Sequence, residues 1–294
     1  MRRNAFSIVV MAAIAVFGVQ VSGQDALTGQ TLLQRHYREG ERLAYRMSGM
    51  ENGRRYEIRA TGVVKRDSVD YFEEYGWSDL VRNGSPVTLA PDIVTFRQRL
   101  SLDPGQIPAI PNLARVPSLI GPITDFLTFY SDLWLAIRRG ELQKAGDRFY
   151  QAGETASSWA DGTTILFGET AIDFDVTLKA VDRTGQTVTL LVRHVPPKRP
   201  LLKFPALWMS ARVGETENNH AGIRRNAGGF TAWVGKETFD VEMTISRVDG
   251  SILSGTLDNV VETRERDCSD PTATNCGDAR SRRVERRIEI ARER

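Results

Sequence analysis

Apolar and polar residues alternate with a period of two over several stretches of the chain. The alternation is clearest in residues 42–47, 55–64, 172–180, 188–192 and 239–246. Successive side chains of a β-strand point to opposite faces of the sheet, so these stretches predict strands with one apolar and one polar face. Asn52-Gly53 and Asp249-Gly250 suit tight hairpin turns. Strands joined by such short turns must be antiparallel.

Residues 122–139 have the period of a helix instead. Their wide apolar stripe includes Phe126, Tyr130 and Trp134, and such a stripe has to be buried. Pro122 suits the first turn of a helix and Gly140 suits its C-cap. The pattern therefore predicts a mainly β protein, with a curved antiparallel sheet or open barrel built from hairpins and this one apolar helix packed on it.

Residues 103–121, just before the predicted helix, are rich in proline. Proline at this density excludes a central strand and favours an extended covering loop. The polar segment 215–229 is also expected to be an irregular loop, and a mobile one.

The first 23 residues have the three-part pattern of a signal peptide. Arg2 and Arg3 precede an uncharged apolar run at residues 5–19, and Val21-Ser22-Gly23 offers small residues for cleavage before Gln24. A membrane-spanning helix needs roughly 20 apolar residues, so this run is short for a retained anchor. We expect an exported protein, periplasmic or secreted, without a membrane span after cleavage. An N-terminal segment, residues 24–35, would then lead into a single β-rich domain, residues 36–294.

Removal of the signal peptide changes the charge balance. The chain has 39 basic and 37 acidic residues, and the loss of two arginines leaves 39 − 2 = 37 basic residues. A nucleic-acid-binding protein normally carries a basic excess that neutralises phosphates. The neutral balance argues against that class of partner.

The two cysteines, Cys268 and Cys276, predict a disulfide, because export places them in an oxidising compartment. The bond would lie at the tip of a C-terminal hairpin formed by residues 258–292. The last segment also fits a helical period, through Val284 and Ile288, but a strand is the preferred interpretation. A metal-binding or redox pair would need closer cysteines and a neighbouring histidine.

The sequence contains none of the motifs H-E-x-x-H, G-x-S-x-G, the P-loop or G-x-G-x-x-G. There are three histidines in all, which argues against a multi-histidine metal site. We therefore predict neither a metal nor a cofactor.

Two polar residues fall on apolar faces of predicted strands, where functional sites are often found. Glu73 is in phase with Tyr71 and Tyr75, and a carboxylate among aromatic rings could act as a general acid. The alternative for Glu73 is an ion pair with an arginine at the rim of the sheet. His194 follows the apolar phase of residues 188–192, either as a second catalytic candidate or as a hydrogen-bonded histidine of the core or strand end.

The segment Tyr37-Arg38-Glu39-Gly40-Glu41-Arg42-Leu43-Ala44-Tyr45 resembles the Y-x-x-G-E-x-L-x-Y start of uncharacterised exported β-rich domains of bacteria. The resemblance implies export and a β-rich fold, and it implies no activity. A curved sheet with one apolar helix is also similar in plan to periplasmic lipoprotein carriers with open barrels.

Three functions are compatible with this sequence. A lipid or other apolar ligand, or a partner segment, could be enclosed by the sheet, with Phe126, Tyr130 and Trp134 as binding candidates. A hydrolase could act through a carboxylate, with Glu73 as the first candidate and His194 as the second. A structural or assembly module could bind another envelope protein along an exposed edge strand.

Overall fold

The computed structural model describes residues 32–51, 53–106, 113, 116–153, 155–157, 165–199, 202–210 and 218–294. The predicted signal peptide, most of the N-terminal segment, Asn52 and part of the proline-rich loop lie outside these residues. Within them, no helix is both long and apolar enough to cross a membrane.

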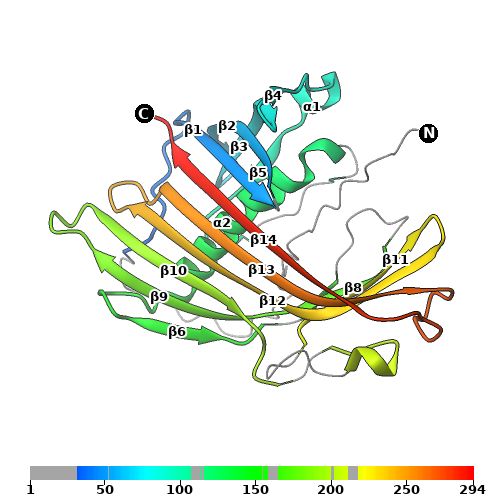
Figure 1. Ribbon diagram of the computed structural model, residues 1–294. Coiled ribbons are helices and arrows are strands. Elements are labelled where there is room, and N and C mark those ends of the chain that lie inside the picture. Colours follow the sequence, from blue (N-terminus) through cyan, green and yellow to red (C-terminus); the bar gives the residue numbers. More distant parts are fainter. Residues whose placement is uncertain are drawn as a thin grey trace.

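The secondary structure is dominated by strands (Figure 1). In chain order the elements are β1 (Arg42–Glu51), β2 (Arg54–Asp67), β3 (Asp70–Arg82), β4 (Ser85–Pro86), α1 (Pro91–Thr95), β5 (Gln98–Leu100), η2 (Pro117–Leu119), α2 (Ile120–Arg139), β6 (Arg148–Gln151), β7 (Thr155–Ser157), β8 (Ile165–Ala171), β9 (Asp173–Val181), β10 (Thr187–Val195), η3 (Leu207–Ser210), β11 (His220–Asn226), β12 (Gly229–Ser246), β13 (Ile252–Cys268) and β14 (Arg280–Arg292).

All 14 strands belong to one antiparallel sheet, which does not close on itself. The main path runs β4-β3-β2-β1-β14-β13-β12-β10-β9-β6. The alternation seen in the sequence is confirmed. In β1, Leu43, Tyr45 and Met47 are buried while Arg42 and Arg46 are exposed, as expected for a sheet that covers a core on one face.

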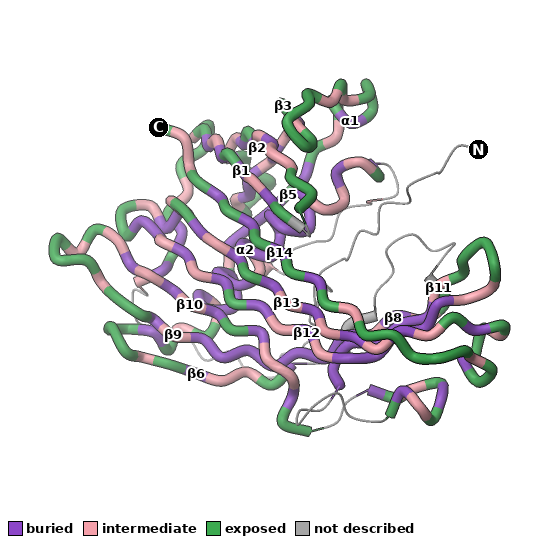
Figure 2. The backbone as a smooth tube through the Cα atoms, in the orientation of Figure 1, coloured by how far each residue is buried: buried purple, intermediate pink, exposed green. Residues whose placement is uncertain are grey.

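Helix α2 lies across the concave face of this sheet and is buried on almost all sides (Figures 1 and 2). Gly140 takes a left-handed conformation with φ 63°, and its N–H donates to the carbonyl of Ile137, so it ends the helix as predicted. The start differs slightly from the prediction. The 3₁₀ turn η2 leads directly into the helix at Ile120, and Pro122 is tolerated because the first-turn N–H groups have no partner within the helix.

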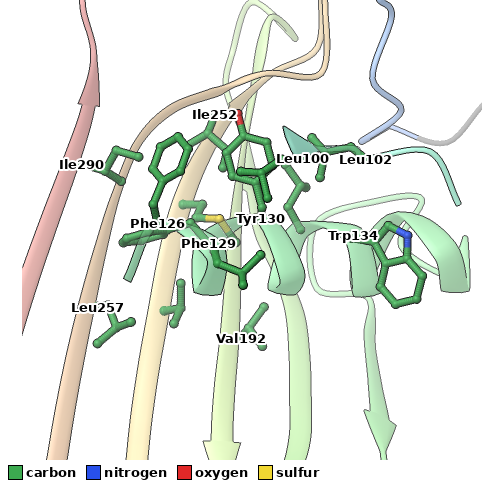
Figure 3. Packing of buried hydrophobic residues seen from close by; sticks show 14 of the residues in the cluster. Leu100, Leu102, Phe126, Phe129, Tyr130, Trp134, Val192, Ile252, Leu257 and Ile290 are labelled. Carbon is green, nitrogen blue, oxygen red and sulfur yellow. The ribbon is translucent and has the colours of Figure 1, made fainter. Parts of the chain in front are cut away.

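The main core lies between α2 and the strands (Figure 3). Phe126 and Phe129 point from the helix into the sheet and are fully buried. Gly255 of β13 makes room for Phe129, because a Cβ atom at this position would lie 2.8 Å from Cε1 of that ring. This contact fixes how closely the helix can approach the sheet.

The strands β10 and β11 are two parts of one interrupted strand. Both pair with β12 on one side. On the other side, β10 pairs with β9 and β11 pairs with β8, and β8 and β9 are consecutive in the chain. Val195 is opposite Asp173, and the N–H of Ala171 donates to the carbonyl of Asn219. On the side of β8 and β9, only Ile172 therefore lies between the two paired regions, and it faces the break between β10 and β11. The chain leaves the sheet after Val195 and is paired with it again from Asn219, and we call residues 196–218 the excursion.

The prediction of an irregular, mobile segment at residues 215–229 is wrong for its later part, because β11 occupies His220–Asn226. The polar side chains of this strand hid its pattern. With β7, β8 and the adjoining ends of β12 and β13, it forms an extension of the sheet that we call the wing.

A second, smaller core lies on the opposite face of the wing. It includes Ala221, Ile223 and Val234 of the strands, whose positions alternate with those that share the face of α2. Ala206 and Met209 of the excursion cover them. The excursion is thus anchored to the outside of the sheet.

The C-terminal hairpin forms as expected, with β14 as a strand paired to both β13 and β1. Cys268 and Cys276 lie at disulfide distance, with their sulfurs 2.03 Å apart. Their loop touches the excursion, because the indole N–H of Trp208 donates to the carbonyl of Ala273 at 2.9 Å.

Replacing Gly255 by alanine should destabilise the fold by about 1–3 kcal/mol, the usual cost of overpacking a core. The new methyl group would meet the ring of Phe129 and the backbone of Glu242. Urea denaturation would measure the loss. Gly121→Ala is the control, because no atom lies within 4 Å of its added Cβ. Equal stability of the two variants would contradict this account of the interface.

Candidate functional site

The five candidate residues from the sequence all lie at the interface between α2 and the concave face of the sheet. Glu73 is on β3 and His194 on β10, while Phe126, Tyr130 and Trp134 are on α2. Tyr130 bonds Glu73 directly, and His194 bonds another side chain of the same helix. We therefore treat this interface as the candidate site.

Glu73 is the centre of the first polar contact. It is 1% exposed, and its Oε1 accepts a hydrogen bond from Nε of Arg35 at 2.9 Å. Its Oε2 accepts from the hydroxyls of Tyr75 and Tyr130, at 2.8 and 2.5 Å. Arg35 also contacts Glu41 at 3.0 Å. The cluster ties the N-terminal segment, the sheet and the helix together.

Protonation reinforces this arrangement. Burial, together with the neighbouring Glu73, holds the pKa of Tyr130 well above its usual range, so its hydroxyl keeps the proton that it donates. Burial opposes the charge on Arg35, but the attraction and hydrogen bond of Glu73, together with Glu41 and Tyr130, outweigh it and raise the pKa of the guanidinium. With three donors and almost no exposure, Glu73 matches the geometry of the ion-pair alternative more closely than that of an accessible acid.

The second polar contact joins Asp132 of α2 to His194 of β10. Nε2 of His194 lies 2.8 and 3.0 Å from the two carboxylate oxygens. The rings of Phe174 and Phe239 flank the imidazole, with centroids 4.8 and 4.3 Å away. Burial raises the pKa of Asp132, although His194 partly offsets that effect.

The third polar contact lies near the start of the helix. Asp125 accepts a hydrogen bond from the hydroxyl of Tyr56 at 2.6 Å and forms an ion pair with Arg286 of β14. Burial raises the pKa of Asp125, against the opposing effect of Arg286 and Tyr56. The sequence analysis missed this contact. The sequence did contain a signal for it. Asp125 and Asp132 are seven residues apart, so they lie on the same side of the helix, among its apolar residues.

The three ligand-binding candidates are packed into the core around these contacts (Figure 3). The ring of Phe126 stands edge-on to Tyr75 and Trp77, with centroids 4.9 and 5.5 Å away. The indole N–H of Trp134 donates to the carbonyl of Asp103 at 3.0 Å. With α2 in this position, the candidates contact protein rather than solvent, so a ligand could reach them only if the helix moved.

Another buried polar cluster surrounds His220, at the break between β10 and β11. The indole of Trp233 can only donate a hydrogen bond, so Nε2 of His220, 2.9 Å away, must accept. The proton then lies on Nδ1, next to Oγ1 of Thr170 at 2.9 Å and Oε2 of Glu237 at 3.4 Å. Burial lowers the pKa of His220, against the effect of Glu237.

This tautomer has a chemical consequence. A histidine that activates a hydroxyl must offer that hydroxyl a nitrogen without a proton. The nitrogen facing Thr170 carries one, so the threonine, histidine and glutamate do not form a nucleophilic triad here.

Comparison with known proteins adds no functional assignment, since no protein-family model and no curated protein matches this chain.

Replacing Glu73 by glutamine should lower stability by about 3 kcal/mol, because it leaves the charge of buried Arg35 partly unpaired. Glu41 still contacts Arg35, which keeps the loss at the lower end of the usual range. Thermal and urea unfolding would measure it. The control is Asp258→Asn, which breaks an exposed pair with Arg287 and should cost less than about 1 kcal/mol. An unchanged melting temperature for Glu73→Gln would contradict a structural role.

Asp132→Asn should reveal the raised pKa of Asp132. The unfolded chain releases this proton near pH 4, while the native protein holds it to a higher pH, so native protonation stabilises at low pH and the benefit is lost as the pH rises. Relative to the variant, the wild-type protein should therefore lose stability from about pH 4 upward. Unfolding free energies of both proteins between pH 4 and 7 would show it. A constant difference would rule out the shift.

Proposed function

We propose that this protein is an exported, non-enzymatic binding protein that takes up a lipid or other apolar ligand on the concave face of its sheet. In this proposal α2 occupies the binding surface in the unliganded state and moves when the ligand enters. The apolar partner segment of another envelope protein is the alternative occupant of the same surface.

The observation that carries the proposal is the set of three polar contacts between α2 and the sheet. Asp125, Tyr130 and Asp132 each bond a side chain of the sheet or its edge. A helix that only completes a core has no need of charged groups at its buried face, and apolar residues there are as stabilising or more so. Polar groups make separation less costly, because water can satisfy both halves of each contact once the helix has moved.

The shape of the sheet supports the same function. It is open, so it can spread slightly, and its concave face is apolar from β3 to β9. Without α2 this face would be a large exposed apolar surface, which in a protein is typical of a ligand or partner site.

Export is supported by the signal-peptide pattern and by the cysteine pair at disulfide distance. Disulfides persist in oxidising compartments and are rare in the cytosol. A carrier of apolar molecules between membranes would work in such a compartment.

The other two functions have less support. A hydrolase that uses Glu73 would need access to a carboxylate that is 1% exposed and has three donors. Assembly along an edge strand would need a long free edge, whereas β4, β5, β6 and β7 have two to four residues each. Residues 280–285 of β14 pair with β13 but not with β1, and this edge carries three arginines, which discourage pairing with another strand. Short edge strands protect a sheet from pairing with another chain.

Native mass spectrometry of residues 24–294, purified from the exported fraction, followed by organic extraction, tests for a bound ligand. We expect a stoichiometric apolar molecule, or uptake of a fluorescent fatty acid by the extracted protein. Absence of both would overturn the proposal.

A double variant tests the role of the helix. Asp132→Ala with His194→Leu replaces the second polar contact by apolar residues, which should be neutral or stabilise by about 1–4 kcal/mol. A helix held more firmly should take up the fluorescent fatty acid several-fold more slowly, as stopped-flow measurements would show.

The matched control is Asp258→Ala with Arg287→Leu, which removes an exposed ion pair of the outer face. It should leave the uptake rate unchanged. Equal uptake by the wild-type protein and by the Asp132/His194 variant would contradict the movement of α2.

A further inference from the structure

The excursion is the second feature of this fold that the strand pairing of the sheet does not require, although it covers the second core. The strand it interrupts lacks only the position opposite Ile172. Asn219 fills that gap, since its side-chain amide accepts from the N–H of Glu237 at 2.8 Å and donates to the carbonyls of Glu237 and Ala171 at 2.9 and 3.0 Å. A side chain thus replaces the missing peptide group, and the sheet closes here without a hydrogen bond from the excursion.

The described part of the excursion presents an apolar residue to solvent. Leu207, the first residue of η3, is 90% exposed, the highest value among the large exposed apolar residues of the described chain. Figure 1 shows η3 as the short yellow-green helix outside the sheet, beneath β8 and β11. An isolated exposed leucine is ordinary, so its surroundings decide what it means.

The residues on either side of Leu207 are packed against the sheet. Leu202, Ala206 and Met209 are buried in the second core. Trp208, next to Leu207, bonds the disulfide loop and has the guanidinium of Arg266 4.9 Å from its ring centroid. Leu207 is thus held outward by its neighbours on both sides.

The segment that carries Leu207 is rich in basic residues. Residues 196–210 contain three basic residues, Lys198, Arg199 and Lys203, and no acidic residue. All three are exposed. Glu169 of β8 is close enough to Lys203 for the lysine to lower the pKa of this glutamate, against the effect of burial. Glu169 and Asp270, which lies in the disulfide loop that Trp208 contacts, offset part of this charge, while Arg266 adds to it.

We propose that η3 and the adjoining basic residues dock the protein on the surface of a bilayer that contains anionic phospholipids. Leu207 enters the headgroup region, and Arg199 and Lys203 contact lipid phosphates. Peripheral binding of this kind combines a small apolar insertion with attraction to anionic lipid, and it weakens as salt screens the charges. The proposal is independent of the function proposed for the concave face.

Flotation with vesicles tests the proposal, using protein purified from the exported fraction. The vesicles are phosphatidylethanolamine with phosphatidylglycerol, or phosphatidylcholine alone. We expect binding to the anionic vesicles, at least fivefold weaker binding to the neutral ones, and loss of binding at 0.5 M salt, where the Debye length is roughly 4 Å. Leu207→Glu and Arg199→Glu/Lys203→Glu should each lower binding at least fivefold.

The control is Val69→Glu, which changes a 76% exposed residue in the turn between β2 and β3. It should bind as the wild-type protein does. Melting temperatures would verify that all variants fold, as expected for changes at exposed positions.

Two results would overturn the proposal. The wild-type protein could stay unbound in the presence of anionic vesicles, or Leu207→Glu could bind them as well as the wild type does. Failure of ligand extraction from the concave face would leave this proposal standing, and failure of flotation would leave the ligand proposal standing.

Discussion

Keeping one face of the sheet out of water is the constraint on which the rest of the fold depends. Outside the wing, the strands are apolar on the concave face and polar on the other, and α2 is the helix that covers the apolar face in the described part of the chain. Full burial of a side chain such as Phe126 or Phe129 contributes about 1.5–3 kcal/mol. Displacement of the helix would therefore be unfavourable unless another apolar body took its place, which makes helix and ligand competitors for one surface.

The polar contacts lower the cost of displacing α2, and they also fix its position on the sheet. Contacts through Asp125, Tyr130 and Asp132 are spread along two turns of α2, so only one axial position and one rotation of the helix satisfy all three. Apolar packing alone tolerates small slips, whereas buried polar groups penalise them. Through Arg35, the same network orders the segment that enters the first strand.

Much of the fold follows from local patterns in the sequence. Period-two alternation identified β1, β2, β9, β10 and β12, because on a one-sided sheet burial repeats with the pleat. Gly140 marked the helix end because its left-handed conformation favours glycine. β11 was missed because its inner positions hold His220 and Gly222, and Gly222 leaves space for the ring of Trp233. Such packing depends on partners that are distant in the sequence.

The candidate site was only partly predictable for the same reason. Glu73 and His194 were recognisable as polar residues in apolar phases, but a sequence does not identify a partner such as Arg35, 38 positions away. The acids of α2 were visible, and their shared side of the helix was a usable signal. The tautomer of His220 needed the position of Trp233, which only the folded chain provides.

The interrupted strand has an implication for the history of such proteins. Because Asn219 closes the sheet where β10 and β11 meet, both ends of the excursion are fixed within a register that does not depend on what lies between them. Segments of different length can then be exchanged at this point without changing the strand register, provided that they keep apolar residues such as Met209 against the second core. The break thus behaves as an insertion cassette, through which related chains could acquire different surface attachments while keeping the same concave face.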